Sequence, residues 1–293
     1  MVARVMRCLY VDLDGTLLWP GGSIVRGGDG RFALEGVRAL QACDRAGAEV
    51  VLYSGRRQRT VFEDSRLLGL SSFIFEAGCG LVVDGELEWL TGGVEPSFEA
   101  GTIYEQIDAS GAPRLLLESF PGRLEYHMPW SSGREVSHLF RGLIDLGEAP
   151  ALLAAAGLGW LRLLANGVVH EHMAPLRTGE ADAAIRVESG LRPDLPVVRA
   201  YHLIPAAASK TRAVARHMQI RGYAPGECIA VGDSREDLGA GEVVSCFWLV
   251  ANALESDPTL SDALGPRVRV ASASYGAGVY EAVITTLAES KAA

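Results

Sequence analysis

Cysteine is scarce in this sequence, and the pattern of its cysteines argues against two common kinds of protein. The five cysteines are odd in number, widely separated and without a Cys-x-x-Cys pair. Disulfide-rich secreted domains and structural zinc sites both need more regularly spaced cysteines. The pattern fits a reducing compartment, and we expect the protein to be cytoplasmic.

Long hydrophobic stretches and basic clusters are also missing. No run of about 18 apolar residues exists that could span a bilayer, and Asp12 interrupts the short apolar run near the N-terminus, so no signal peptide is readable. The densest basic cluster is short, Arg56, Arg57 and Arg59, in a chain with a formal charge of -9. Such a chain repels polyanions. We therefore expect neither a membrane nor nucleic acid as a partner, whereas a small anionic substrate stays compatible.

The composition is that of an ordinary globular protein. Apolar residues make up 48% and charged residues 22% of the 293 residues, which allows a sizeable buried core. The length suits a core domain that carries a second, smaller domain.

Several short apolar runs end in a polar residue followed by glycine or a turn, as buried parallel strands that lead into a ligand site do. The three runs that matter are 8–11 before Asp12, 50–53 before Ser54 and 229–231 before Gly232-Asp233. Helical stretches follow the first two, and residues 73–75 form a further strand. This alternation predicts an α/β protein with an open parallel sheet, whose carboxyl edge gathers the polar residues.

The pattern changes between residues 81 and 198, where we predict an inserted α+β domain. The core is then formed by residues 1–80 and 199–293. The elements expected in the insert are a hairpin at 81–89, strands at 115–119, 123–127 and 161–164, and helices at 135–144 and 149–156. The elements expected in the second core segment are a helix at 210–218, a strand at 246–250 and a terminal helix at 279–289.

The first chemical motif is Asp12-Leu13-Asp14-Gly15-Thr16, at the end of the first strand. Carboxylates at i and i+2 project to the same side, where two like charges do not both stay ionised comfortably. Cleavage of a phosphate ester through a covalent intermediate requires a nucleophile, here Asp12, and a general acid and base, here Asp14. Gly15 allows a tight turn and Thr16 offers a hydroxyl to phosphate. An isolated motif of this kind is also compatible with a turn and a helix cap.

Two weaker sequence elements indicate a phosphate site only in combination with the stronger motifs. Ser54-Gly55-Arg56 ends the second strand, where the Ser54 hydroxyl and free amides such as that of Gly55 suit phosphate oxygens. Ser-Gly after a strand is, however, usually just a turn. Lys210 opens an amphipathic helix, where a lone lysine is most often a solvated surface charge.

The motif Gly-Asp-Ser-Arg-Glu-Asp, which ends at Asp237, is the second strong element. It places Asp233 and Asp237 four residues apart after a strand, on one face of a turn or first helical turn. Mg²⁺ prefers such carboxylate oxygens and takes one or two of them from a protein. We expect Mg²⁺ to be held by Asp233, Asp12 and the main-chain carbonyl of Asp14, with Asp237 ligating through water or orienting Lys210.

In this order the four motifs resemble those of the haloacid dehalogenase-like (HAD) superfamily, over about residues 7–80 and 200–290. The long insert resembles the cap of the Cof-type subclass IIB, which includes sucrose-phosphate and mannosyl-3-phosphoglycerate phosphatases. The resemblance implies a Rossmann-like core, a mobile α/β cap and an Mg²⁺-dependent phosphatase that forms an aspartyl-phosphate. The roles it implies are Asp12 as nucleophile, Asp14 as acid and base, Thr16 and Ser54 on phosphate, Lys210 on phosphate and nucleophile, and Asp233 and Asp237 at the metal.

Two departures from the family pattern are visible. Glu76-Ala77-Gly78 stands where many relatives have Glu-Asn-Gly, and Glu236-Asp237 stands where they have Asn-Asp. The first removes an amide near the cap hinge, and the second adds a charge. Neither touches the catalytic carboxylates or the lysine, so the chemistry is expected to survive, but substrate inferences from any one relative weaken.

We expect an enzyme that hydrolyses a small phosphorylated metabolite, a sugar phosphate or a phosphoglycerate-type ester, because a large cap closes over a compact molecule and excludes water. The alternatives are a phosphomutase of the same superfamily and a non-catalytic binding protein that retains the fold. Either a monomer or a homodimer is expected.

Other polar residues stay open between function and structure. His170 and His172 could share a metal, but a third ligand at fitting spacing is missing, so a structural role is favoured. Residues that are equally compatible with substrate contact and with an ordinary surface position are Arg56, Arg57, Glu125, His127 and Asn166.

Overall fold

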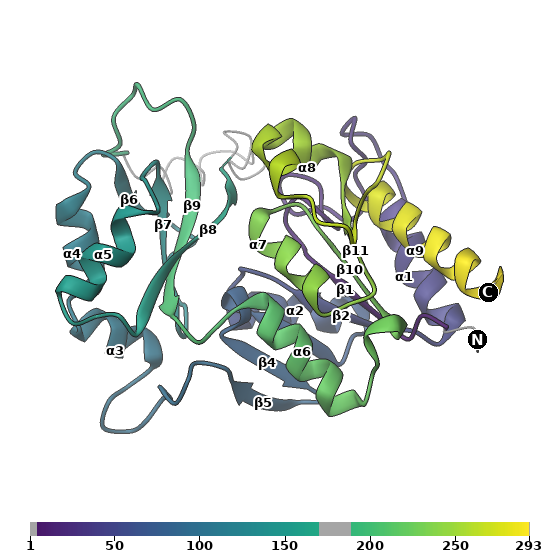
Figure 1. The fold of residues 1–293 in the computed structure, drawn as a ribbon, viewed down its shortest axis with the longest axis horizontal. Helices are drawn as coiled ribbons and strands as arrows, with labels where there is room; N and C mark the ends of the chain where they lie inside the picture. The colour runs from purple at the N-terminus through teal and green to yellow at the C-terminus, as the bar shows by residue number, and fades with distance from the viewer. Residues whose placement is uncertain (1–4, 170–188, 293) are drawn as a thin grey trace.

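The computed structural model describes residues 5–169 and 189–292, and it contains two sheets (Figure 1). The histidines at positions 170 and 172 lie outside the described residues. The strands of the large sheet are β1 (Cys8–Val11), β2 (Glu49–Tyr53), β3 (Ser72–Phe75), β4 (Gly80–Val83), β5 (Glu86–Trp89), β10 (Cys228–Gly232), β11 (Cys246–Leu249) and β12 (Val268–Val270). The helices that accompany it are α1 (Glu35–Ala46), α2 (Gln58–Leu68), η1 (Glu76–Gly78), α6 (Lys210–Arg221), α7 (Arg235–Leu238), α8 (Ala251–Ser256) and α9 (Tyr275–Ala292).

The large sheet has the order β12-β11-β10-β1-β2-β3-β4-β5. Its strands from β12 to β3 pair in parallel, and the pairs β3–β4 and β4–β5 are antiparallel. The predicted α/β fold with an open parallel sheet is confirmed. β1 and β10 lie side by side at its centre, which brings the ends of two motif-bearing strands together.

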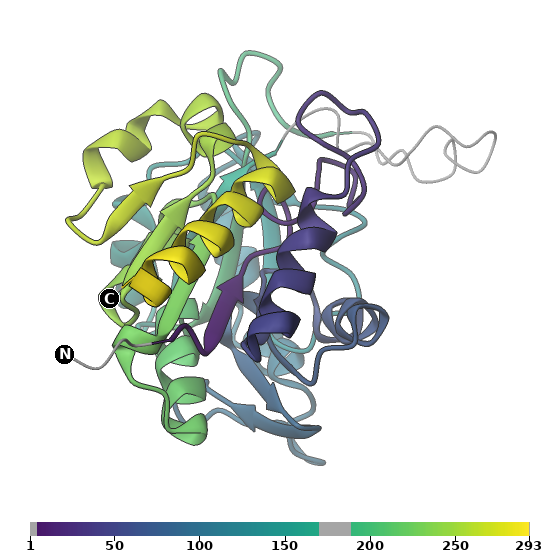
Figure 2. The same cartoon turned by 90° about the vertical axis from the view of Figure 1, so that its right-hand side faces the viewer.

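Helices cover both faces of the large sheet because its central strands are apolar on both sides. Leu9 and Val11 pack in the cluster that includes α1, α2 and α9, whereas Tyr10 packs in the cluster under α6. Figure 2 shows α1 and α9 side by side on one face. Each fully buried side chain of this size contributes about 1.5–3 kcal/mol relative to an exposed one. The sheet is therefore a rigid platform for the loops at its carboxyl edge.

The segment from α3 to β9, which we call the cap, forms a smaller layer pair beside the core (Figure 1). Its sheet has the order β6-β7-β9-β8, and its helices pack with one face of that sheet. The cap elements are α3 (Ile103–Ala109), α4 (Ala112–Ser119), β6 (Leu124–Tyr126), β7 (His138–Gly142), α5 (Glu148–Ala155), β8 (Leu161–Val168) and β9 (Arg199–Pro205).

Strand pairing places the division between core and cap differently from the sequence. The hairpin β4–β5 extends the large sheet to Trp89, and β9 belongs to the small sheet up to Pro205, whereas the predicted insert ran from 81 to 198. The sequence indicates that a hairpin forms, but not which strand it pairs with. That choice depends on contacts between distant segments, here between β3 and β4 and between β8 and β9.

Two elements of the cap were predicted wrongly. Residues 115–119 form the end of α4 rather than a strand, because Ala112 and Leu116 are buried four residues apart, at helical spacing. Residues 138–142 form β7 rather than part of a helix. β7 lies between β6 and β9 and is buried on both faces, so it lacks the alternation that marks a half-buried strand.

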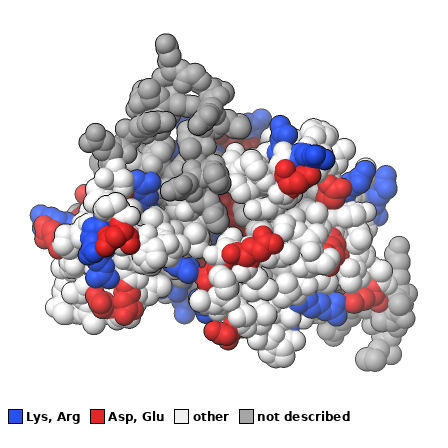
Figure 3. Space-filling model, turned by 90° about the horizontal axis from the view of Figure 1, so that it is seen from above, with Lys and Arg blue, Asp and Glu red and all other residues white. Residues whose placement is uncertain are grey.

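Two further features concern the surface. Among the described residues, no helix is long and apolar enough to cross a membrane. On the face in Figure 3, basic and acidic side chains are interspersed over the described part of the molecule, and they form no continuous basic surface there.

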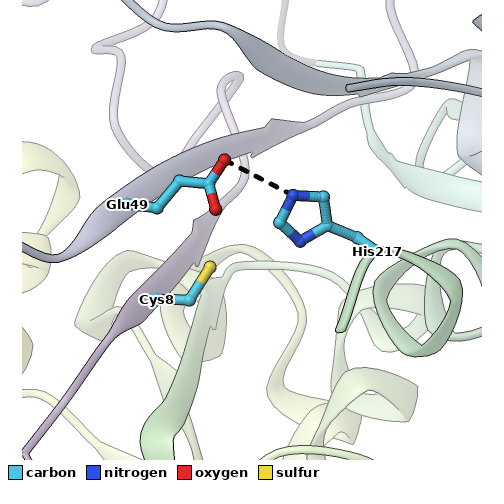
Figure 4. Close-up of side chains that lie close together, drawn as sticks. All are labelled: Cys8, Glu49 and His217. Carbon is cyan, nitrogen blue, oxygen red and sulfur yellow. Dashed lines mark ion pairs between the residues drawn. The ribbon is translucent and has the colours of Figure 1, made fainter. Parts of the chain in front are cut away.

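A polar cluster lies between the sheet and α6, at the amino-terminal ends of β1 and β2 and thus at the opposite end of the strands from Asp12. Cys8 begins β1, Glu49 begins β2, and His217 projects from α6 towards both (Figure 4). The three offer potential metal-ligand atoms within 4.8 Å of one another, and the Glu49 carboxylate lies 3.5 Å from His217 Nε2.

The partners of Glu49 favour a structural role for this cluster. Its Oε1 accepts hydrogen bonds from Ser72 Oγ at 2.7 Å and Arg221 Nη2 at 2.9 Å, and its Oε2 accepts one from Tyr223 at 2.9 Å. The Arg221 guanidinium already lies on Glu49 Oε1, and its positive charge would repel a metal cation at this carboxylate. We interpret the cluster as a network that fastens α6 to the strands.

We expect Glu49→Gln to destabilise the fold by roughly 1–3 kcal/mol at neutral pH, because it weakens hydrogen bonds to charged partners. The measurement is the free energy of unfolding in urea, with the exposed Glu86→Gln as the control. Equal decreases in the free energy of unfolding of the two variants would contradict a stabilising role of the Glu49 network.

The same difference should depend on pH. Burial raises the pKa of Glu49, but the nearby His217, Ser72 and Arg221 outweigh burial and lower it from 4.5 to about 2. The native state then favours the ionised form, so the stabilisation is complete above the unfolded pKa and is lost as the pH falls towards 2. The gap between wild type and Glu49→Gln should therefore narrow below about pH 4.5.

Candidate active site

The two strongest motifs meet because they follow neighbouring parallel strands. Val11 of β1 is paired with Val231 of β10, so Asp12 and Asp233 emerge at the same edge of the sheet. Ligands of open α/β sheets bind at this carboxyl edge. Asp12 is buried, with 4% of its surface exposed. The charge of its carboxylate must therefore be compensated by neighbouring protein groups rather than by water.

Gly15 allows the two motifs to approach each other. Its φ is +84°, and a β-carbon on it would lie 2.4 Å from Asp233 Oδ2. Any other residue would push Asp233 away from the first motif. Thr16 follows directly, and its hydroxyl donates a hydrogen bond to Asp233 Oδ1 at 3.0 Å. In this structure Thr16 therefore orients Asp233.

Lys210 is a buried cation rather than a surface charge. It begins α6, only 1% of it is exposed, and its Nζ donates to Asp12 Oδ1 and Asp237 Oδ1, both at 2.7 Å. Burial alone lowers the pKa of Lys210, but Asp12 and Asp237 outweigh burial and raise the pKa well above its usual value. The ammonium is thus held charged beside Asp12.

Asp237 is engaged at both oxygens. Besides the bond from Lys210, its Oδ2 accepts hydrogen bonds from Ser234 Oγ at 2.7 Å and from the amides of Ser234 and Asp233 at 3.0 and 3.3 Å. Of the two roles expected for this residue, the geometry favours the orientation of Lys210. The turn before α7 is fixed by the same contacts.

Three carboxylates converge at this edge of the sheet. Asp12, Asp233 and Asp237 each offer one oxygen, and these oxygens lie within 4.8 Å of one another. Burial raises the pKa of Asp12 to about 7, against the opposing effect of Lys210. Burial and the neighbouring Asp12 raise the pKa of Asp233 well above its usual value. Such a set of hard oxygen donors, buried and mutually repelling, fits a divalent cation.

Asp14 takes a different position, and its partner was not predicted. Its carboxylate accepts two hydrogen bonds from Arg56, from Nε at 2.6 Å and from Nη2, and Arg56 Nη1 also donates to Asp64 at 2.9 Å. The Asp14 side chain is 39% exposed. A bidentate guanidinium fixes the plane of a carboxylate. The only sequence signal for Arg56 was its place just after the second strand.

Ser54 and Gly55 lie at the same edge, after β2. Ser54 is buried, and its hydroxyl accepts a hydrogen bond from the amide of Arg56 at 3.2 Å. The carbonyl of Gly55 accepts a hydrogen bond from Arg134 of the cap at 3.0 Å. The structure therefore brings both residues to the edge that also carries Asp12.

Glu76 links the core to the cap, a role that the sequence did not indicate. Its buried carboxylate accepts hydrogen bonds from the amides of Glu135, Val136 and Ser137 at 2.8, 3.1 and 2.6 Å. The backbone φ of Glu76 is +46°, an unfavourable value for a residue other than glycine. The segment before β7 is thereby fastened to the core beside the site.

Glu236, the residue that departs from the family pattern, has its carboxylate buried beside the site. Its two carboxylate oxygens are buried and have no hydrogen-bond partner among the described residues. Burial raises the pKa of Glu236 to about 8, although Lys210 acts in the opposite direction. Burial thus opposes the additional negative charge that was expected at this position.

Comparison with known proteins identifies the fold. No family model and no curated protein matches the sequence. Sucrose-phosphatase of Synechocystis sp., solved with sucrose and phosphate, is 13% identical with a TM-score of 0.60, over 96% of this chain and 98% of that one. A Bacteroides thetaiotaomicron phosphatase of the haloalkanoate (HAD) superfamily is 14% identical with a TM-score of 0.58, over 97% and 96%. A sugar phosphatase of HAD subclass IIB is 13% identical with a TM-score of 0.56, over 98% and 97%.

The chain thus has the fold of HAD phosphatases over nearly its whole length. This confirms the fold that the resemblance implied, a Rossmann-like core with an inserted cap. At such low identity the likeness establishes the fold, and the argument for function depends on the residues of the site.

We expect Lys210→Met to cost roughly 3–5 kcal/mol of unfolding free energy, because it leaves Asp12 and Asp237 buried without their cation. The measurement is urea denaturation at neutral pH without added metal. Arg212→Met, an exposed position on the same helix, is the charge-matched control. A loss no larger than that of the control would show that the ammonium does not hold the two carboxylates.

Proposed function

We propose that this chain is an Mg²⁺-dependent phosphohydrolase that acts on a small phosphorylated metabolite through an aspartyl-phosphate at Asp12. The observation that carries the proposal is the buried ammonium of Lys210, 2.7 Å from both Asp12 and Asp237, with Asp233 beside them. The fold shared with HAD phosphatases supports it. A buried carboxylate next to a fixed cation is suited to attack an anionic phosphoryl group.

The proposed reaction has two steps. A carboxylate oxygen of Asp12 attacks phosphorus, the bond from phosphorus to the ester oxygen breaks, and Asp14 gives a proton to the departing alcohol. Water then attacks the phosphorus of the aspartyl-phosphate, Asp14 takes the proton from that water, and the bond to Asp12 breaks to release phosphate. Asp14 is more exposed than Asp12, as a group that meets both the leaving group and water must be.

Asp12, Asp233 and the main-chain carbonyl of Asp14 are the groups that would hold Mg²⁺, with Asp237 acting through Lys210. Each of the first two carboxylates has an oxygen without a hydrogen-bond partner among the described residues, which suits a metal ligand. When bound, the cation offsets the charge of the phosphoryl oxygens. Ser54, the amide of Gly55, Thr16 and Lys210 complete the proposed phosphate site.

The substrate class that we propose is a sugar phosphate or a phosphoglycerate-type ester. The cap is fastened to the core at Gly55 and Glu76, close to the reacting edge, so the leaving group must fit in a restricted space. Among proteins with this fold, one was solved with sucrose and phosphate and another is named a sugar phosphatase. A compact polar leaving group is consistent with both points.

Asp12→Asn should lower Mg²⁺-dependent release of phosphate from p-nitrophenyl phosphate by at least about 1,000-fold, because an amide does not form the covalent intermediate. The exposed Asp44→Asn on α1 is the matched control and should retain wild-type activity. Activity that survives in purified Asp12→Asn would reject Asp12 as the nucleophile.

Mg²⁺ should stabilise the wild-type protein against thermal unfolding. One site contributes about 2.7 kcal/mol when free Mg²⁺ is a hundred times its dissociation constant. We expect the shift in melting temperature to disappear in Asp233→Asn and to persist in Asp262→Asn, which changes an exposed carboxylate. Equal shifts in all three proteins would place the cation elsewhere.

A further inference from the structure

Two side chains of the cap reach the backbone of the proposed phosphate site. A β-carbon on Gly55 would lie 2.5 Å from Asn166 Nδ2 and 2.9 Å from His202 Nε2. Asn166 belongs to β8 and His202 to the neighbouring β9. Only glycine permits this approach, so the amide of Asn166 lies directly against the turn that follows Ser54.

A chain of hydrogen bonds from the core fixes these side chains, and it begins at Glu76. The carboxylate of Glu76 accepts a hydrogen bond from the Ser137 hydroxyl at 2.9 Å. A carboxylate that also accepts three main-chain amides acts here as an acceptor, so the single hydroxyl proton of Ser137 is committed to it. The lone pairs of Ser137 Oγ are left to accept from Arg134 Nη1, at 2.9 Å, and from His202.

The tautomer of His202 follows from this arrangement. Its Nδ1 lies 3.2 Å from Ser137 Oγ and must donate, because Ser137 has no further proton. Burial and the nearby Arg134 lower the pKa of His202 well below its usual value, so the ring is neutral. Its Nε2 is then a bare acceptor.

The orientation of Asn166 is fixed in turn. Its side-chain amide lies 3.2 Å from His202 Nε2 and must present Nδ2–H to it, because an oxygen there would face a lone pair. The oxygen Oδ1 lies at the other corner of the same planar group and has no hydrogen-bond partner among the described residues. Asn166 therefore has its Nδ2 against Gly55 and His202, and its Oδ1 is left as a pre-oriented acceptor on the same planar group.

We propose that Asn166 Oδ1 accepts a hydrogen bond from a hydroxyl of the leaving group close to the phosphorylated carbon, and so selects hydroxylated esters over apolar ones. This inference depends on the proposed function. Asn166 is the binding residue, and Ser137 and His202 position it. A leaving group without a donor leaves the amide oxygen unpaired when the site closes, and the enzyme discriminates against it for that reason.

The test compares glycerol 3-phosphate with n-propyl phosphate, which has the same carbon chain without hydroxyl groups. We expect wild type to prefer the glycerol ester in kcat/KM. Asn166→Ala and Asn166→Leu should lower kcat/KM for glycerol 3-phosphate roughly three- to tenfold, the value of one neutral hydrogen bond. The loss for n-propyl phosphate should be smaller in both variants, because this ester has no hydroxyl to donate to the amide oxygen, so the ratio of the two kcat/KM values should fall. Asn166→Leu keeps the number and branching of the side-chain heavy atoms, so it separates loss of the acceptor from loss of packing better than Asn166→Ala does.

His202→Leu tests the positioning chain. It should lower kcat/KM for glycerol 3-phosphate, mainly through KM, by a larger factor than for n-propyl phosphate, because the amide of Asn166 loses its hydrogen-bond partner. The exposed Glu118→Ala on α4 should change neither ester. Thermal unfolding of each variant verifies that the cap remains folded.

The outcomes separate this inference from the proposed function. Hydrolysis of p-nitrophenyl phosphate that depends on Asp12, with no preference for glycerol 3-phosphate or with equal losses for both esters in Asn166→Leu, overturns the role of Asn166 and leaves the phosphatase intact. A larger loss with phosphoethanolamine than with glycerol 3-phosphate would assign the acceptor to an ammonium and overturn the hydroxyl. Absence of any Asp12-dependent hydrolysis rejects both proposals.

Discussion

The ion pair of Lys210 with Asp12 and Asp237 is the contact on which the site depends. Three charged groups taken out of water are costly unless they neutralise one another, and removing one leaves the others uncompensated. The ammonium therefore fixes the start of α6 against the ends of β1 and β10. The position of Asp12 is set by a balance of buried charges as well as by the strand that precedes it.

The second constraint is the attachment of the cap to the core. Glu76 holds three amides of the segment before β7, and Arg134 returns from that segment to the carbonyl of Gly55. Glu76 and Arg134 also hydrogen-bond to Ser137, which is part of the series of hydrogen bonds that orients Asn166. The contacts that attach the cap to the core thus also determine which polar atoms of the cap lie near the Gly55 turn.

Asp14 and Asp12 illustrate how one motif produces two environments. Asp12 is buried beside an ammonium, whereas Asp14 is partly exposed and held by the guanidinium of Arg56. In the proposed reaction Asp14 exchanges protons with the leaving group and water, so the guanidinium of Arg56 has to release one of its oxygens. The two carboxylates can therefore serve different steps although they are two residues apart.

The sequence by itself determined the parallel sheet and the residues at its carboxyl edge. Short apolar runs that end in Asp12, Ser54 and Asp233 are local patterns, and parallel strands necessarily gather such ends. Tertiary structure alone decided that Arg56 binds Asp14 and how Asn166 is oriented, since both depend on partners from distant segments. It also decided that β7 is a strand, because burial on both faces removes the alternation that a local pattern would reveal.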